Sequence, residues 1–345
     1  MPDLSRPLLA LLTSLALSAT AATPEPMALD ASFNPVDQAA NLVELAQDAS
    51  TLKGLKRVAV TQFSIDFITQ DNVSAETSGF AAAGRASVTG YYALVGVGEP
   101  EFQALAERAY REFVDALKAQ GLEVVSREEL AAAPSWQRLN AAGTPLPLRS
   151  DSMITVGPAG MSIYGTQKAR TQQGQKGLLG GLAALGSITS AIGAQGDLKS
   201  LREELGNASL IEVSLRMHFA QLANGNRGFF GRLSDTAKVS AKAHPVVSRA
   251  ELSVQGDFKT ALLQVKPPLL LDANAFSEVR KPAATTGEIA GAVATGLLRM
   301  AIGSKDSHST EKFEVVSDPE RYAAVVGSGL AQTNALLIAR MVGAR

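Results

Sequence analysis

The sequence contains no cysteine, so the first candidates for chemistry are its three histidines. His218 lies beside Arg216 in an alternating stretch, His244 precedes a proline, and His308 lies in the segment "SKDSHSTEK". None of them has a second histidine or an acid at the four-residue spacing of a zinc-binding helix, and structural zinc sites usually need cysteine. We therefore predict no metal site, and we expect the three histidines at surface or loop positions.

Short motifs typical of enzymes are incomplete. The stretch "GMSIYG" (160–165) has the wrong spacing for a serine nucleophile elbow, and "STEK" (309–312) lacks the companion motifs of the S-x-x-K enzymes. Neither "GVGEPE" (96–101) nor "GQKGLL" (174–179) completes a phosphate-binding glycine pattern. Glu128 and Glu129 follow Ser126, a good helix N-cap, and we interpret them as first-turn charges. We predict a protein without enzymatic activity or cofactor.

Composition sets limits on the partners. Lys and Arg total 32 against 33 Asp and Glu, which gives a net charge of −1, and no dense basic run occurs. A general nucleic-acid binder needs a basic surface to neutralise phosphates, so we predict no nucleic-acid partner. The chain has 345 residues, of which 46% are hydrophobic, enough to bury a large core.

The first 22 residues, "MPDLSRPLLALLTSLALSATAA", have the pattern of a cleaved signal peptide. A short polar start with Arg6 precedes a leucine-rich stretch, and Ala19 to Ala21 fit the small-residue cleavage pattern. The alternative is a buried amino-terminal helix. We expect an exported protein of the bacterial periplasm or outer membrane, without disulfides or an acylated cysteine.

The mature part begins with elements of both helix and strand type. Residues 34–54 predict a short helix that includes Val43, Leu45 and Ala46, and residues 55–67 predict a strand. The best helix starts at Pro100, ends at Gly121 and is followed at once by the strand "LEVVS". Its apolar stripe consists of Phe102, Leu105, Ala109, Phe113 and Leu117. A strand, a helix and a second strand predict a unit whose two strands are parallel.

A further strand is predicted where apolar and polar residues alternate strictly in residues 209–222. Its apolar side chains are Ile211, Val213, Leu215, Met217 and Phe219, so we expect an antiparallel strand with one wet face. Residues 248–265 predict another such strand, and residues 223–235 a hairpin tip between the two. Residues 86–98 predict a strand pair or a flap.

The remaining segments predict a loop and two closing helices. Residues 131–160 are rich in proline and glycine, which predicts a surface loop, with Trp136 and Leu139 as packing anchors. One helix is expected from Thr285 and Glu288, with Met300 on its apolar stripe and Gly303 at its end; the other is expected from Ser317 and Glu320. The pattern predicts an α/β or α+β fold with a mixed twisted sheet flanked by helices. We assign residues 23–54 to an N-terminal segment and 55–345 to one domain, with insertions near 64–98 and 150–197.

One uncharged stretch, "GLLGGLAALGSITSAIGAQG" (177–196), stands out in this mixed sequence. In a helix, one apolar seam would be formed by Leu178, Leu182, Leu185, Ile188 and Ile192. Its glycines make an isolated helix marginal, and a conventional membrane span is disfavoured. Three interpretations stay open: a helical arm that packs on the body or on another copy, a membrane-surface or pore-forming element, and a flexible glycine loop. We predict that the seam is an apolar binding surface.

The order of elements resembles a known periplasmic domain. The stretch "VVSREEL" (124–130), together with "RVAVTQF" (57–63) and "ASLIEVSLRMHF" (208–219), resembles the α/β domain of the curli secretion-channel family and the amino-terminal domain of the Tol translocation protein. The resemblance covers residues 55–265 and rests on element order. It implies envelope assembly or export, with oligomers, and it makes residues 86–98 and 177–196 the counterparts of the barrel-building inserts of the channel family. The chain lacks that family's lipid-bearing cysteine, and its second insert has helical spacing.

Together these features predict a non-enzymatic envelope protein with a binding or assembly role. Its partners would be other envelope proteins or further copies of itself, with contact to a membrane surface as a further possibility. Two alternatives are kept: a periplasmic carrier of an apolar ligand, with residues 177–196 as a lid, and an unrecognised hydrolase that uses dispersed carboxylates.

Overall fold

The computed structural model describes residues 25–76, 87–164, 196–224, 237–257, 259–282, 298–302 and 308–345. The expected signal peptide, the apolar seam of residues 177–196 and the helix start at Thr285 and Glu288 lie outside the described residues.

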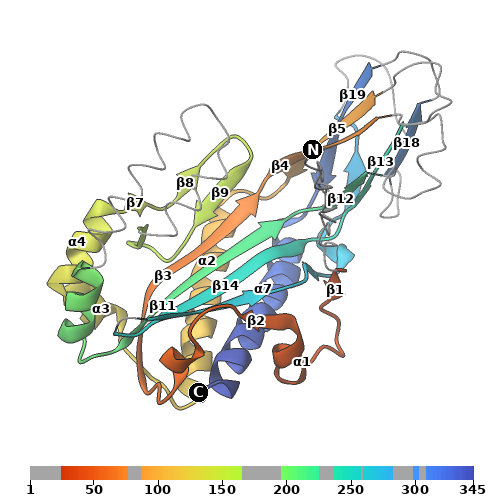
Figure 1. Ribbon diagram of the computed structural model, residues 1–345. Helices are drawn as coiled ribbons and strands as arrows, with labels where there is room; N and C mark the ends of the chain where they lie inside the picture. The colour runs from red at the N-terminus through yellow and green to blue at the C-terminus, as the bar shows by residue number, and fades with distance from the viewer. Residues whose placement is uncertain are drawn as a thin grey trace, which may run out of the picture.

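One long mixed sheet forms the body of the protein (Figure 1). Its strand order is β1 (Met27–Ala28), β16 (Leu269–Leu270), β14 (Val246–Gln255), β11 (Ser209–His218), β3 (Arg57–Ile68), β9 (Met153–Val156) and β8 (Leu148–Arg149). Beside this path, β15 (Thr260–Val265) pairs with β14 and with β2 (Val43–Leu45), and β6 (Glu123–Val124) pairs with β3. The sheet and its helices confirm the predicted α/β or α+β class.

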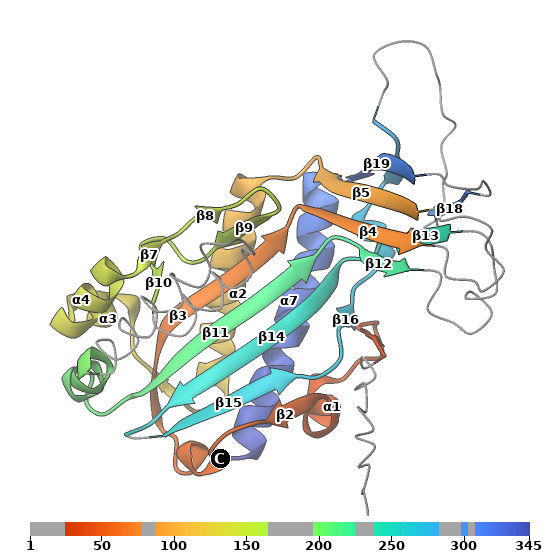
Figure 2. The same ribbon diagram turned by 45° about the horizontal axis from the view of Figure 1, so that its top comes forward.

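Two long helices, α2 (Glu99–Ala119) and α7 (Pro319–Gly343), pack against each other and cover one face of this sheet (Figures 1 and 2). The predicted stripe of α2 is buried, and the helix ends before Gly121, whose φ of +75° suits glycine. Strands β3 and β6 are parallel, as the strand-helix-strand unit predicted.

A one-residue shift in the alternation of β3 explains how its apolar side chains reach the helices on both sides of Thr61. Val58 and Val60 point to the helix-covered face, but after a β-bulge at Thr61 the apolar positions are odd-numbered, beginning with Phe63. A bulge inserts one unpaired residue and so shifts a period-two pattern by one position. The sequence "VAVTQFSIDF" carries this switch, because its apolar spacing is interrupted only at Thr61 and Gln62.

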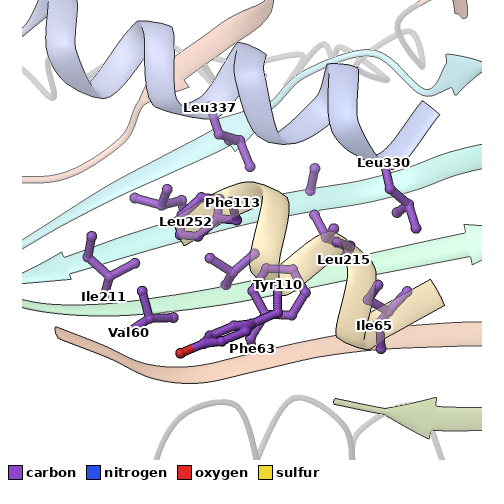
Figure 3. Packing of buried hydrophobic residues seen from close by; sticks show 14 of the residues in the cluster. Val60, Phe63, Ile65, Tyr110, Phe113, Ile211, Leu215, Leu252, Leu330 and Leu337 are labelled. Carbon is purple, nitrogen blue, oxygen red and sulfur yellow. The ribbon is translucent and has the colours of Figure 1, made fainter. Parts of the chain in front are cut away.

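The core lies between the three central strands and the two helices (Figure 3). Phe63 meets the ring of Tyr110 edge-on at 5.7 Å between centroids, and Phe67 stacks on Phe102 at 4.4 Å. Leu330 and Leu337 reach the same core from α7, and both are buried. Burial of each such side chain contributes about 1.5 to 3 kcal/mol, so this layer holds the helices on the sheet.

The body strands continue into a β extension that projects beyond the helices (Figures 1 and 2). One of its sheets has the order β17 (Glu278–Arg280), β19 (His308–Val316), β5 (Ser87–Val95) and β4 (Gln70–Glu76), and the other has β12 (Gln221–Asn224), β13 (Ala237–Lys242) and β18 (Leu298–Ile302). Only Thr69 separates β3 from β4, and two residues separate β11 from β12. The extension is therefore continuous along the chain with the central strands β3 and β11.

The parallel strands β5 and β19 connect the extension to the helices. Each runs toward the body and leads directly into a long helix, β5 into α2 and β19 into α7. The two turns touch: the backbone nitrogen of Ser317 donates to the carbonyl oxygen of Val95 over 2.9 Å. Gly96 has a φ of +89°, and a Cβ atom there would lie 2.0 Å from the carbonyl oxygen of Ser317.

Smaller elements complete the body. They are α1 (Pro35–Leu42), the 3-10 helices η1 (Ala49–Leu52) and η3 (Ala273–Ala275), α3 (Arg127–Ala132), α4 (Pro134–Ala142), the strand pair β7 (Thr144–Pro145) and β10 (Ser162–Ile163), and a helical segment over 196–204. The surface loop predicted for residues 131–160 is wrong, because this segment forms α4 and three strands. Trp136 and Leu139 are buried, as expected of packing anchors.

Several sequence predictions at the element level are corrected. Residues Val43 to Leu45 form strand β2 and not part of a helix, because they pair with β15. Met300 lies in strand β18, which pairs with β13, and not in a helix. The cap of α7 is Asp318, whose side chain accepts from two backbone nitrogens, while the Ser317 hydroxyl donates to the carbonyl oxygen of Ala275. Residues 248–265 form the hairpin β14–β15, and not one strand.

Within the described residues, α7 is the one helix long and apolar enough to cross a membrane by length and composition. Its most apolar window is 56% buried in the protein. Because it packs on α2, α1 and the body sheet, we interpret it as a core helix.

The contact between the two strand-to-helix turns can be tested at Gly96. We expect Gly96→Ala to lower the free energy of unfolding by about 2 to 4 kcal/mol, because both the left-handed φ and the nearby carbonyl oxygen oppose a side chain. The matched control is Gly121→Ala, which has a similar φ of +75° but no heavy atom within 4 Å of the added Cβ. Urea unfolding of both variants measures the difference, and an equal loss would show that the close approach to Ser317 contributes nothing.

Candidate functional site

The face of the body sheet opposite α2 and α7 carries a continuous set of polar side chains, which we call the polar face. Alternation puts these residues there because their strand neighbours point into the core. The polar face consists of Gln62, Ser64, Asp66, Thr155, Glu212, Ser214, Arg216, His218, Arg249, Glu251, Ser253 and Gln264. It is less wet than the sequence predicted, because Ser214 and Glu251 are buried and Glu212, Arg216 and His218 are half-buried.

Asp66 is the centre of the polar face. Its side chain is 3% exposed, and its Oδ2 accepts from Arg216 Nη2 at 2.9 Å and from Arg249 Nη2 at 3.4 Å. Its Oδ1 accepts from the hydroxyl of Thr155 at 2.8 Å. Arg216 and Arg249 lie directly opposite each other on β11 and β14, where two like charges alone would repel. The shared carboxylate thus joins β3, β11, β14 and β9.

A second cluster lies nearer the start of β3. Gln62 Nε2 donates to Glu212 Oε1 at 2.9 Å, and its Oε1 accepts from the backbone nitrogen of Tyr164 at 2.9 Å. Burial raises the pKa of the Tyr164 phenol, and the nearby Glu212 carboxylate raises it further. The segment before Tyr164 therefore covers this end of the polar face.

His218 lies where the polar face meets the extension. Its Nδ1 is 3.7 Å from Asp71 Oδ2, which belongs to β4. Burial lowers the pKa of His218, Asp71 raises it, and Arg216 lowers it again, with a net lowering below the usual 6.5. The ring is therefore held neutral at the junction between body and extension.

These contacts join the side chains of the polar face into a network of hydrogen bonds between strands. Asp66 and Glu212 both accept from donors on other strands, and Glu251 accepts from Gln264 Nε2 at 2.9 Å. In the described part of the chain, no group of three or more His, Asp or Glu residues could hold a metal ion. Chemically, the polar face presents the partly exposed guanidinium groups of Arg216 and Arg249, which suit recognition of a polar partner surface.

Glu129 and His218, two titratable residues singled out in the sequence, do not meet. Glu129 accepts from Arg57 Nη2 at 2.6 Å, at the start of β3, whereas His218 lies beside Asp71 beyond the end of β3. Strand β3 runs from residue 57 to residue 68, a length of roughly 35 Å at ~3.3 Å per residue. These two side chains therefore cannot serve one active site.

The other residues singled out in the sequence lie in separate places. Trp136 packs in the core and its Nε1 donates to the carbonyl oxygen of Thr61 at 3.5 Å. His244 Nδ1 is 3.2 Å from the carbonyl oxygen of Leu271, between β13 and β14. His308 begins strand β19, so its predicted loop position is wrong. The seam of Leu178, Leu182, Leu185, Ile188 and Ile192 lies outside the described residues.

Sequence reasoning missed Asp66, Arg249 and Gln62 as members of one site. The signal that could have found them is alternation of polar residues: Gln62, Ser64 and Asp66 on β3 repeat at every second position, as do Arg249 and Glu251 on β14. Period two predicts a common face for each strand, but which strands become neighbours is a property of the tertiary fold.

The chain matches no protein-family model, no curated protein and no solved structure. A functional proposal must therefore rest on the residues and geometry of the chain itself. The polar face, the extension and their junction are the features on which it depends.

The central carboxylate can be tested by Asp66→Asn. We expect a loss of about 2 to 4 kcal/mol in the free energy of unfolding, because two half-buried guanidinium groups lose the charge they share. The control is Glu203→Gln, which breaks an exposed pair with Lys199 and should cost at most about 0.5 kcal/mol. Chemical denaturation measures both, and equal small losses would show that the network does not hold the strands together.

The lowered pKa of His218 predicts a pH dependence of stability. Because the folded protein holds this ring neutral, folding opposes its protonation, and the stability present above pH 6.5 declines as the pH falls below that unfolded value. We expect wild-type protein to lose more stability between pH 7.5 and pH 5.5 than the variant His218→Gln. Thermal unfolding at several pH values measures this, and parallel curves for the two proteins would contradict it.

Proposed function

We propose that this protein is an exported component of the bacterial cell envelope that acts by binding, in the periplasm or at the outer membrane, and not by catalysis. The signal-like first 22 residues and the uncharged segment 177–196 support export and adhesion to an apolar surface. The proposed partners are other envelope proteins or further copies of this chain, with contact to a membrane surface included.

The single observation that carries this proposal is the projecting β extension. Strands β3, β11 and β14 are held in register in the body. Along the chain, β4 follows β3, β12 follows β11, and β13 precedes β14, so these three strands of the extension continue the strands of the body. Because the extension is continuous with the central strands, a partner bound there would be attached to the core through the backbone of those strands. Two strand-to-helix turns that meet at Ser317 strengthen the same junction.

The polar face gives further support. Its charged groups bind one another across four strands, so they are ordered before any partner arrives. Preordered guanidinium groups lose little freedom when they bind, which favours specific contact with an acidic or polar surface. The resemblance of the element order to the curli secretion-channel and Tol domains agrees with a role in assembly or secretion.

Site-specific photocrosslinking in cells tests the proposal. A crosslinking amino acid replaces Tyr91, whose side chain in β5 of the extension is 47% exposed, and, as matched control, Gln120, which is exposed at the opposite end of α2. We expect crosslinks to an envelope protein or to a second copy from position 91 and none from position 120. Fractionation of the same cells should place the protein in the envelope, and deletion of residues 177–196 should release it or prevent assembly.

Two results would contradict this proposal. A mature protein that stays monomeric, forms no crosslink from position 91 and remains soluble with or without residues 177–196 would overturn the binding role. A cytoplasmic location would overturn export.

A further inference from the structure

The extension sheet of β17, β19, β5 and β4 has one buried face and one exposed face (Figure 2). On the buried face Tyr92 stacks on Phe313 at 5.1 Å between ring centroids, and both side chains are 2% exposed. Alternation puts the residues between them on the opposite side, which we call the outer face. The outer face consists of Gln70, Asn72 and Ser74 of β4, Thr89, Tyr91 and Ala93 of β5, Thr310, Lys312 and Glu314 of β19, and Arg280 of β17. Most of these side chains are exposed, and the rest are half-buried.

Tyr91 lies in the middle of the outer face. Strand pairing places Lys312, Tyr91 and Asn72 side by side in one row across β19, β5 and β4. Tyr91 is 47% exposed, and within the described part of the extension it is the one large hydrophobic residue that is exposed. Exposed aromatic rings of this kind are the usual anchors of protein interfaces, and they lie near the interface centre.

Lys312, beside Tyr91, differs from the other cations of this sheet. Arg280 pairs with Glu314, with Nε and Oε2 2.9 Å apart, and with Glu278. Lys281, at the edge of the sheet, pairs with Glu311 at 2.7 Å. Lys312 is exposed and has no ion pair with any residue that the structure describes. Its ammonium group is therefore available to a group on another molecule.

From this arrangement we propose that the outer face binds the outer face of a second copy, with Lys312 of each copy over the ring of the partner's Tyr91. The two-fold axis runs parallel to β5 and β19 and between them, so β19 of one copy lies over β5 of the other. A Lys ammonium within about 6 Å of a Tyr ring centroid is attracted to the face of the ring, and the symmetry forms this contact twice. The inference rests on the binding role proposed above and names its partner.

The rows on either side of Tyr91 fit the same packing. Glu314 lies over the partner's Ala93 and Thr310 over the partner's Thr89, so no like charges meet. The strands of the two sheets stay within about 30° of each other, as in aligned sheet packing. A two-fold axis across the strands and through Tyr91 would instead bring the two Lys312 ammonium groups together. Charge therefore favours the axis along the strands.

The size of the outer face sets the strength of the contact. Four strands and the seven paired positions of β4 and β5 span at most roughly 19 Å by 23 Å. Two copies would then bury about 900 Å² in total, less than the ~1,200 Å² at which specific, stable interfaces begin. We therefore expect a dimer that dissociates at micromolar concentration.

Sedimentation velocity of the full mature chain tests the dimer. Between about 1 and 100 μM we expect the wild-type protein to change from monomer to dimer. Tyr91→Ala removes both anchoring rings and should weaken the dimer at least about tenfold. The control is Val36→Ala, which trims a side chain 71% exposed on α1 and should change nothing. A wild-type protein that is monomeric throughout, or an equal loss in both variants, would overturn the proposal.

The charge of Lys312 gives a second test. Lys312→Met keeps the length of the side chain but removes its charge and should weaken the dimer several-fold, whereas Lys312→Arg keeps a cation over the ring and should preserve it. Lys118→Met, at an exposed position of α2, is the matched control. Thermal unfolding checks that each variant is folded. Equal affinities of the two Lys312 variants would contradict the contact with Tyr91.

Chemical crosslinking tests the direction of the axis, and the absence of native cysteine makes it specific. Gln70→Cys and Arg280→Cys, prepared as two variants of different mass, are mixed and treated with a short bismaleimide. The proposed axis places Gln70 over the partner's Arg280 at about 10 Å, whereas the two copies of Gln70 are about 18 Å apart. We expect crosslinks between the two variants and few within either one. Equal crosslinking within each variant would overturn this packing.

The outcomes separate this inference from the proposed function. A monomeric purified chain that crosslinks from position 91 to another envelope protein in cells would overturn the second copy as partner and leave the envelope role standing. A dimer with the expected response to the Tyr91 and Lys312 variants, in a protein found in the cytoplasm, would do the reverse.

Discussion

The carboxylate of Asp66 imposes the constraint on which the arrangement of the body depends. A charged group 3% exposed must be bound by donors, and here the donors come from three other strands: Arg216 of β11, Arg249 of β14 and Thr155 of β9. The three donors reach one carboxylate only if β11 is parallel to β3 and β14 antiparallel to β11 in the observed registers. A slip of one residue would turn each of these side chains toward the core. The strand order of this sheet and the hydrogen bonding of its buried carboxylate therefore depend on each other.

The opposite face of the same strands depends on packing. The bulge at Thr61 lets β3 place Val58 and Val60, and then Phe63, on the helix side, although these residues do not share one alternation. Helices α2 and α7 cover this side, and both begin where the parallel strands β5 and β19 end. The extension and the helical layer are thus continuous through two turns that meet at Ser317. The extension therefore joins the start of both helices, where the backbone nitrogen of Ser317 donates to the carbonyl oxygen of Val95.

The polar face and the β extension contribute to the proposed binding role in different ways. On the polar face Asp66 is buried, and among its donors only the half-buried Arg216 and Arg249 can reach a partner. The extension instead offers exposed side chains such as Tyr91, which is 47% exposed.

Much of the architecture was readable from the sequence, because amphipathic periodicity is local. The three- and four-residue spacing in α2 and the alternation in β11 each named the buried side chains correctly, and a strand, a helix and a strand in succession predicted the parallel pair β3 and β6. The local pattern predicted the wrong element where a short apolar run fits both a helix and a strand. Val43 to Leu45 and Leu298 to Ile302 became strands because β15 and β13 offered unpaired edges. The candidate site was out of reach for the same reason: residues 66, 155, 216 and 249 meet only after strands distant in sequence are placed side by side. Periodicity thus determined which face of each element is apolar, while the tertiary fold alone decided which elements are neighbours, because hydrogen bonding between strands and pairing of charges join residues far apart in the chain.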